Sequence, residues 1–144
     1  MKRLMSTSND VALTMLRVVL GVVFFAHGAQ KMLGWFGGFG FHGTMGAFTQ
    51  MGMPAALAFL IICTEFFGGL GLIFGLLTRI AAFGVGCLMI GAIFMVHMPN
   101  GFFMNWMGSQ KGEGIEYHLL VLAMAGALLL RGAGAFSLDR ALAK

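Results

Sequence analysis

Four apolar stretches dominate this sequence, and each is about as long as a helix that crosses a lipid bilayer. They cover residues 11–34, 54–77, 80–98 and 115–131. A helix rises about 1.5 Å per residue, so about 20 apolar residues cross a hydrocarbon core about 30 Å thick. Backbone polar groups find no water in that core, and helices satisfy them internally. The sequence therefore predicts an all-α, integral membrane four-helix bundle.

Composition supports this fold class and favours a single domain over residues 1–144. Hydrophobic residues make up 59% of the chain, charged residues make up 10%, and the mean hydropathy is +0.91. These values lie far from those of soluble globular domains. The 23 glycines fit the same class, because small residues let helices approach one another closely in lipid.

Two shorter segments are expected at the membrane surface. Apolar side chains recur at helical spacing within residues 39–51, which predicts an interfacial helix between the first two spans. Ser137 and Asp139 suit the N-cap and first turn of a helix, so a short C-terminal surface helix is predicted over residues 137–144.

The first apolar stretch also has a rival interpretation as a cleavable signal peptide, because two basic residues precede it. Thr14 and Arg17 interrupt the apolar run, and the run continues past the only segment that resembles a processing site. We therefore expect this stretch to be retained as a span.

Basic residues are distributed unevenly about the four spans. One side carries six of them and the other carries two: Lys2, Arg3, Arg79, Arg131, Arg140 and Lys144 against Lys31 and Lys111. By the positive-inside rule, this bias predicts a multi-pass topology with both termini in the cytoplasm. The net charge of +4 is then explained by lipid headgroups, and no nucleic-acid partner is expected.

Three ionisable side chains of the first span, Arg17, His27 and Lys31, fall on one arc of the helix with Gly21 and Gly28. At about 100° per residue, Lys31 lies about 40° from Arg17 and His27 lies about 80° from it. In a lipid-exposed helix such groups are scattered or absent, so this arc is predicted to face the inside of the bundle.

The second span carries one acid, Glu65, near the middle of the bilayer. An unpaired ionised side chain at that depth costs about 2.5–3.5 kcal/mol on insertion scales, so the carboxylate needs a partner. Arg17 and His27 are both available at comparable depth. We predict a structural ion pair between Arg17 and Glu65, because a guanidinium binds a carboxylate bidentately.

The third and fourth spans add polar groups at the level of His27 and Lys31. His97 ends the third span, and Glu116 and His118 begin the fourth. Glu116 and His118 are about 200° apart on a helix, so only one of them faces the interior. The small residues on its face favour Glu116 by a narrow margin.

Cysteine chemistry is not expected to carry the function. Cys63 and Cys87 are the only two cysteines, they form no CxxC motif, and they differ in depth by roughly 10 Å. A disulfide needs Cα atoms within about 7 Å, so neither a disulfide nor thiol exchange is predicted.

Four segments of the chain resemble the DoxX family of small membrane proteins. They are LRVVLGVVFFAHGAQKMLG, TEFFGGLGLIFGLLTRIAA, HMPNGFF and GIEYHLLVLAMAGALLLRGAGAFSLDR, which together cover roughly residues 14–140. The resemblance implies a four-helix bundle in a bacterial inner membrane, often associated with redox enzymes. Some members resemble quinone-linked subunits of sulfur-oxidising complexes, and others accompany oxidative-stress proteins. The family is functionally mixed, so the resemblance predicts a fold more firmly than an activity.

Two classes of function remain open, and the sequence does not decide whether the protein is an enzyme. The first is a membrane subunit or partner of a redox system, in which a periplasmic pocket holds a quinone headgroup. Its expected cofactor-binding residues are His27, Lys31, Glu65, His97 and Glu116. The second is a non-enzymatic module that binds or transports a metal ion or small solute, with His27, His97 and His118 as its candidate ligands. The lipid bilayer, a redox partner protein and a second copy of the chain are the expected partners.

Overall fold

The computed structural model describes residues 2–143, and these residues form helices with no β-strand. The long helices are α2 (Val11–Leu33), α4 (Ala55–Cys63) continued through η2 (Thr64–Gly68) into α5 (Gly69–Phe74), α6 (Thr78–Ala92) continued through η3 (Ile93–His97) and η4 (Met98–Asn100), and α7 (Glu116–Arg131). The short elements are α1 (Lys2–Met5), η1 (Trp35–Gly37), α3 (Gly40–Gln50) and α8 (Leu138–Leu142).

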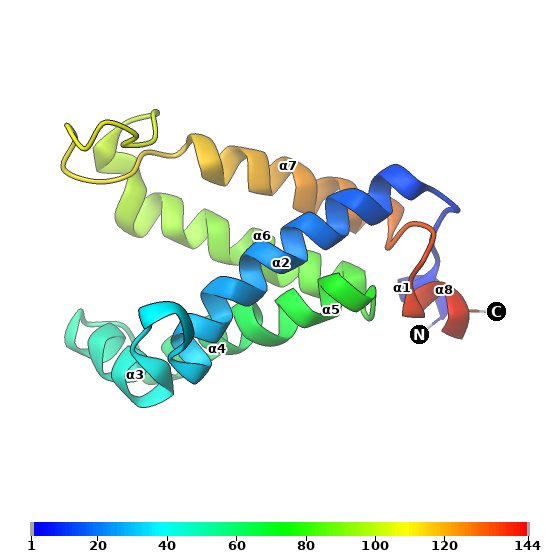
Figure 1. Cartoon of the computed structure of the whole chain (residues 1–144), viewed down its shortest axis with the longest axis horizontal. Helices are drawn as coiled ribbons and strands as arrows, with labels where there is room; N and C mark the ends of the chain where they lie inside the picture. The colour runs from blue at the N-terminus through cyan, green and yellow to red at the C-terminus, as the bar shows by residue number, and fades with distance from the viewer. Residues whose placement is uncertain (1, 144) are drawn as a thin grey trace.

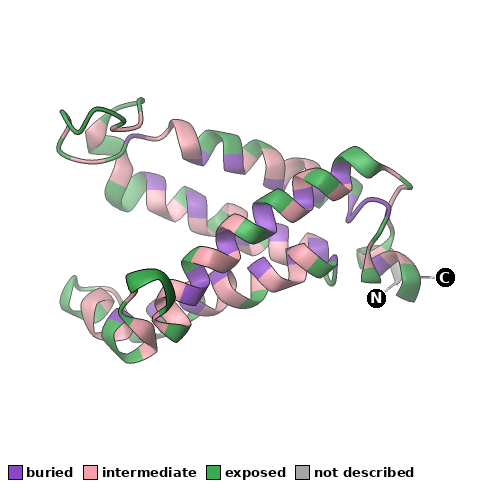
Figure 2. Cartoon of the chain, in the orientation of Figure 1, coloured by how far each residue is buried: buried purple, intermediate pink, exposed green. Residues whose placement is uncertain are grey.

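The long helices run lengthwise through the molecule and pack in two pairs. Helix α2 packs on α5 and η2, and α6 packs on α7 (Figure 1). The chain termini, α1 and α8 lie at one end, which we call the terminal end. Segment 34–54 and loop 101–115 lie at the other, which we call the loop end. The core lies where the pairs cross, and the buried positions face one another there in Figure 2.

Three helices are long and apolar enough to cross a membrane, and they match the first three predicted spans. They are Val11–Leu33, Ala55–Phe74 and Thr78–Asn100. Helix α7 forms where the fourth span is predicted but has only 16 residues, so a fourth crossing stays a prediction.

Both predicted surface segments contain a helix. Helix α3 fills most of residues 39–51, and the Ser137 side chain caps α8 by accepting from the Arg140 N–H. Their position at a membrane surface stays a prediction. Met1 and Lys144, the ends of the predicted domain, lie outside the described residues.

Glycines set the spacing between α2 and the η2–α5 segment. A Cβ added at Gly28 would lie 2.4 Å from the backbone nitrogen of Phe66. A Cβ at Gly69 would lie 2.4 Å from the nitrogen of Phe25, and one at Gly21 would lie 2.7 Å from that of Ile73. The two backbones therefore touch directly, which is the contact that small residues provide in membrane bundles.

Arg17 is fully buried and caps the C-terminal end of α5. Its Nη1 donates to the carbonyl oxygens of Leu72 and Ile73, the latter at 2.7 Å. The last carbonyls of a helix have no partner within it and carry the negative end of the helix dipole, so a guanidinium suits them. Arg17 also donates from Nε to Ala133 and from Nη2 to Phe136, both at 2.9 Å. One side chain thus joins α2, α5 and the segment after α7.

These contacts show that the predicted ion pair between Arg17 and Glu65 is wrong. The guanidinium is used by four backbone carbonyls near the terminal end, while the Glu65 carboxylate pairs with Lys31. The prediction counted only side-chain partners. A helix end inside the bundle offers acceptors of its own, and Arg17 satisfies them.

A second buried charge, Asp139 of α8, caps the other helix of the same hairpin. Its carboxylate accepts from the backbone N–H groups of Leu77 at 2.7 Å and Thr78 at 2.8 Å, at the start of α6. An acid at a helix N-terminus satisfies free N–H groups and suits the positive end of the helix dipole. The short turn between α5 and α6 is therefore held by Arg17 on one side and Asp139 on the other.

We predict that Gly28→Ala destabilises the protein by about 1–3 kcal/mol, the usual range for overpacking a core. The added methyl group meets backbone atoms of η2, which have no side-chain freedom to move aside. Gly86→Ala is the matched control, because a Cβ there meets no atom within 4 Å. Unfolding in a detergent series should show a loss only for Gly28→Ala, and equal behaviour of the two variants would contradict this packing.

Candidate functional site

Lys31 and Glu65 form an ion pair inside the membrane-spanning part of the bundle. Lys31 Nζ lies 2.5 Å from Glu65 Oε2, and it is the one salt bridge within residues 2–143. The Glu65 side chain is 8% exposed and that of Lys31 is 23% exposed. Charged groups in spans are expensive, so this pair supplies the partner that Glu65 needs.

The local backbone explains why these two residues meet. Glu65 lies in η2, a π-helical segment, and π-helical turns in longer helices occur often at functional sites. Gly28 is one helical turn before Lys31, and it touches η2 at Glu65 and Phe66. This close approach brings the lysine side chain alongside the carboxylate.

Two histidine rings contact each other at the same end of the bundle. His97 is the last residue of η3, a second π-helical segment, and His118 lies in the first turns of α7. Their ring centroids are 4.1 Å apart with an interplanar angle of 43°. His118 is only 4% exposed, and its Nδ1 has no hydrogen-bond partner among the described residues. His97 is half-buried, and its Nδ1 lies 2.9 Å from the carbonyl oxygen of Glu113.

Tyr117 lies beside His118 at the start of α7. Its ring centroid is 5.4 Å from that of His118, and its phenol lies within electrostatic range of the Glu65 carboxylate. We call Lys31, Glu65, His97, Tyr117 and His118 the polar cluster. Tyr117 is not among the site residues predicted from the sequence. Its position next to two titratable residues at the start of the fourth span was the available signal.

The choice of Glu116 as the inward residue of α7 is wrong, because His118 is the buried one. The Glu116 carboxylate instead accepts from the backbone N–H of Met104 at 2.9 Å and from Trp106 Nε1 at 3.3 Å. Loop 101–115 folds back over the start of α7 and supplies these donors. As the helical geometry requires, only one of the two residues faces the core.

His27 also departs from prediction, since its side chain is exposed on α2. The helices that pack on α2 contact the side that carries Arg17, Gly21 and Gly28, and His27 lies beyond the edge of that contact. The predicted pocket of five residues is therefore only partly assembled. Lys31 and Glu65 form an ion pair, and the His97 ring contacts the His118 ring. Glu116 accepts hydrogen bonds from loop 101–115.

The alternative metal-ligand set of His27, His97 and His118 does not form. Within residues 2–143, no group of three or more His, Cys, Asp or Glu side chains is arranged to hold a metal ion. The His97 and His118 rings contact each other at a tilt, and the His27 side chain is exposed on α2. Cys63 and Cys87 are both free thiols, as predicted.

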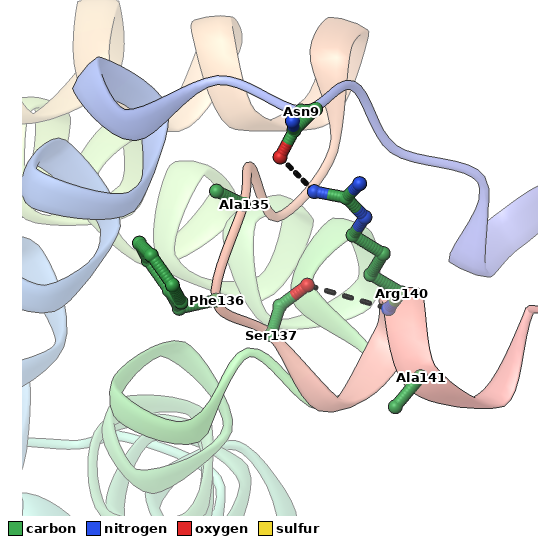
Figure 3. A pocket seen from close by; sticks show the side chains of 6 residues that line it. All are labelled: Asn9, Ala135, Phe136, Ser137, Arg140 and Ala141. Carbon is green, nitrogen blue, oxygen red and sulfur yellow. Dashed lines mark hydrogen bonds between the residues drawn. The ribbon is translucent and has the colours of Figure 1, made fainter.

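A pocket of about 250 Å³ lies at the opposite, terminal end (Figure 3). It is lined by Asn9, Ala135, Phe136, Ser137, Arg140 and Ala141. The Arg140 guanidinium donates to Asn9 Oδ1, and the Arg140 backbone N–H donates to Ser137 Oγ at 3.3 Å. The side chains of Asn9, Ser137 and Arg140 in this pocket are thus hydrogen-bonded within it. We therefore take the polar cluster at the loop end as the candidate site.

An apolar groove of about 510 Å³ runs along the outside of α5 and α6. It begins at Phe67 and Gly68 of η2 and ends at Leu138 of α8. No charged side chain lines it, so it suits a hydrocarbon chain.

The fold and the site define a helical membrane protein with a charged and aromatic cluster at one end. The family model described as DoxX matches residues 12–98, and the chain belongs to that family. The resemblance noted in the sequence is thereby confirmed. No solved structure matches this chain.

Three relatives cover nearly the whole chain. It is 32% identical over 135 residues to "Putative oxidoreductase CatD" of Bacillus subtilis (strain 168), covering 94% of this chain and 90% of that protein. It is 30% identical over 140 residues to "Inner membrane protein YqjF" of Escherichia coli (strain K12), covering 97% and 98%. It is 30% identical over 152 residues to "Uncharacterized membrane protein Rv3486" of Mycobacterium tuberculosis, covering 99% and 88%.

We predict that Lys31 and Glu65 are energetically coupled. Glu65→Gln leaves an ammonium without its countercharge, and Lys31→Met leaves a carboxylate without its partner, so each single change is costly. The double variant removes both charges and should recover about 1–3 kcal/mol relative to the sum, because Lys31 is partly exposed. A double-mutant cycle of unfolding free energies in detergent measures this.

The control cycle combines Glu65→Gln with Lys111→Met, which removes an exposed lysine of the loop. Its two changes should be additive. A Lys31–Glu65 coupling no larger than that of the control would contradict the ion pair.

Proposed function

We propose that this protein is a multi-pass bacterial inner-membrane component of a redox system, and that its polar cluster binds a quinone headgroup. The observation that carries the proposal is the Lys31–Glu65 pair, which lies in two membrane-spanning helices and whose acid is buried on a π-helical turn. Ionisable side chains held inside spans mark functional sites by default. The name "oxidoreductase" for the Bacillus subtilis relative supports a redox association.

The residues of the cluster fit the chemistry of a quinone. An ammonium has three N–H donors, and within residues 2–143 only one bond, to Glu65, is formed by Lys31 Nζ. A carbonyl oxygen of the headgroup is a suitable acceptor for another. Tyr117 adds a hydroxyl and an aromatic ring, and the buried His118 Nδ1 still needs a partner. A bound quinone supplies two-electron redox chemistry, while these side chains orient it and hold the associated protons.

The apolar groove along α5 and α6 is a separate surface that could hold a hydrocarbon tail. Quinones of membranes carry long hydrocarbon tails, which need an apolar surface open to lipid. The groove reaches η2 at Phe67, about 200° around the helix from Glu65, and is lined by Phe67 and Phe74. The aromatic rings suit the packing of an isoprenoid chain.

We predict that Lys31→Gln weakens quinone retention by about tenfold or more, since a hydrogen bond from a charged donor is worth about 1.5–3 kcal/mol. Protein purified into nanodiscs with natural bacterial lipids is extracted, and quinone per protein is measured by mass spectrometry against empty nanodiscs. Lys111→Gln makes the same chemical change on an exposed loop and should leave retention unchanged.

His27→Gln is a second arm of that experiment. His27 is exposed on α2, so its replacement should also leave quinone retention unchanged. Quinone at the level of empty nanodiscs in the unmodified protein would reject the proposal. Stoichiometric metal in the same samples would instead favour the metal-binding function.

The proposed orientation places both termini in the cytoplasm and the polar cluster toward the periplasm. It rests on the excess of basic residues at the terminal end, together with the name of the Escherichia coli relative, "Inner membrane protein YqjF". Trp106 is 83% exposed in the loop that covers α7, so its neighbours should be open to reagents.

We predict that a cysteine introduced at Met107, which is 90% exposed, reacts with a membrane-impermeant thiol reagent added to intact cells. Cys63 and Cys87 are first replaced by Ser so that only the new thiol reacts. A cysteine at Ala141, beside the terminal-end pocket, is the control and should react only after the cells are opened. The reverse pattern would overturn the orientation.

A further inference from the structure

We propose that the terminal end binds one anionic phospholipid, with its phosphate in the pocket beside Arg140 and one acyl chain in the apolar groove along α5 and α6. The pocket and the groove adjoin at the start of α8, where Ser137 lines the pocket and Leu138 lines the groove. No residue of the polar cluster lines either of them, so this lipid site stands or fails separately from the proposed function.

The pocket lies where the membrane-crossing helices end, which is the level of the lipid phosphates. Asn9 of the pocket lies two residues before the first of these helices, Val11–Leu33. Helix α8 is fixed to the turn between the other two, because the Asp139 N–H donates to the Gly75 carbonyl oxygen at 2.8 Å. Figure 1 shows these helix ends together at the terminal end. A lipid whose phosphate lies in the pocket therefore keeps its acyl chains beside the spans.

Arg140 is the one charged side chain among the residues that line the pocket, and it has donors to spare. A guanidinium has five N–H donors. Among the described residues, the Arg140 side chain forms one hydrogen bond, from Nη1 to Asn9 Oδ1, and Figure 3 shows its other nitrogens pointing away from Asn9. The side chain is half-buried, so it is partly ordered before a ligand binds. A guanidinium binds two phosphate oxygens at once, which makes a phosphate a suitable ligand.

The two acids at the terminal end are engaged by helices and do not pair with Arg140. The Asp10 carboxylate accepts from the Ala12 N–H at 2.8 Å, and the Asp139 carboxylate accepts from two backbone N–H groups at the start of α6. Within residues 2–143, Arg140 forms no salt bridge. The pocket therefore has a positive charge without a countercharge from the protein, and an anionic headgroup supplies one.

The groove suits one acyl chain of such a lipid, because no charged side chain lines its volume of about 510 Å³. From Phe67 to Phe74 the helix rises about 10 Å, and Leu138 extends the groove toward the pocket. The hydrocarbon of one leaflet is about 15 Å thick, so the groove matches the half of the bilayer at the terminal end. A lipid chain there excludes a quinone tail from the groove but leaves the polar cluster open to a headgroup.

Native mass spectrometry of the delipidated full chain in detergent, without quinone, tests the site. Phosphatidylglycerol and phosphatidylcholine with the same acyl chains are titrated separately. The anionic lipid should bind about fivefold more tightly or better, and equal affinity would overturn the site. Glycerol 3-phosphate, which has the phosphate but no acyl chain, should not displace phosphatidylglycerol at equal concentration. Displacement would mean that the pocket takes a soluble phosphate, which would also overturn the lipid site.

Two variants test the two halves of the site. Arg140→Gln should weaken phosphatidylglycerol binding about tenfold, while Arg131→Gln removes the same charge from an exposed residue at the end of α7 and should not weaken it. Ile80→Trp fills the groove and should also weaken binding. Ile90→Trp is its control, because Ile90 is equally exposed on α6 but lies outside the groove. If Arg140→Gln fails to fold, the lipid preference of the unmodified protein and the Ile80→Trp result decide. Unchanged affinity in either folded variant would reject the site.

Discussion

A polar group that folds away from water must find its partner within the protein, and in a membrane this constraint applies along the whole length of each span. Arg17 shows how the bundle meets it. The carbonyls at the end of α5 have no partners within that helix, and among residues 2–143 the guanidinium forms no salt bridge with an acid. The guanidinium donates the hydrogen bonds that these carbonyls need. A charge that would be costly in lipid therefore links α2, α5 and the segment after α7.

At the loop end the same constraint is met by departures from regular helix. Both π-helical segments carry a residue of the polar cluster, Glu65 in η2 and His97 in η3. A π turn widens the helix and re-aims the side chains on it, so each residue reaches a partner on another helix. The terminal end is thus held by helix caps, while the loop end collects side chains that are able to change charge. This division is what makes the loop end the better place for function.

The first three spans were predictable because their length and hydropathy depend on the bilayer, whose thickness is fixed. The centre of the buried face of α2 was predictable from helical periodicity, and Arg17, Gly21 and Gly28 are all buried. The partner of Glu65 was not predictable from the sequence. Arg17 binds backbone carbonyls instead of Glu65, and the sequence does not show which carbonyls are free to accept. The choice between Glu116 and His118 depended on how loop 101–115 folds back, and residue spacing within α7 holds no information about that.

The caps at the α5–α6 hairpin have a consequence for how the chain is made. Asp139, which satisfies the N–H groups of Leu77 and Thr78, is synthesised some sixty positions after them, and two of the carbonyls that bind Arg17 come from residues 133 and 136. During synthesis on the ribosome, the hairpin inserts before these partners exist. Its final geometry must wait until the last segment emerges and docks. The C-terminal residues therefore complete the helix caps last, after the helices have been inserted.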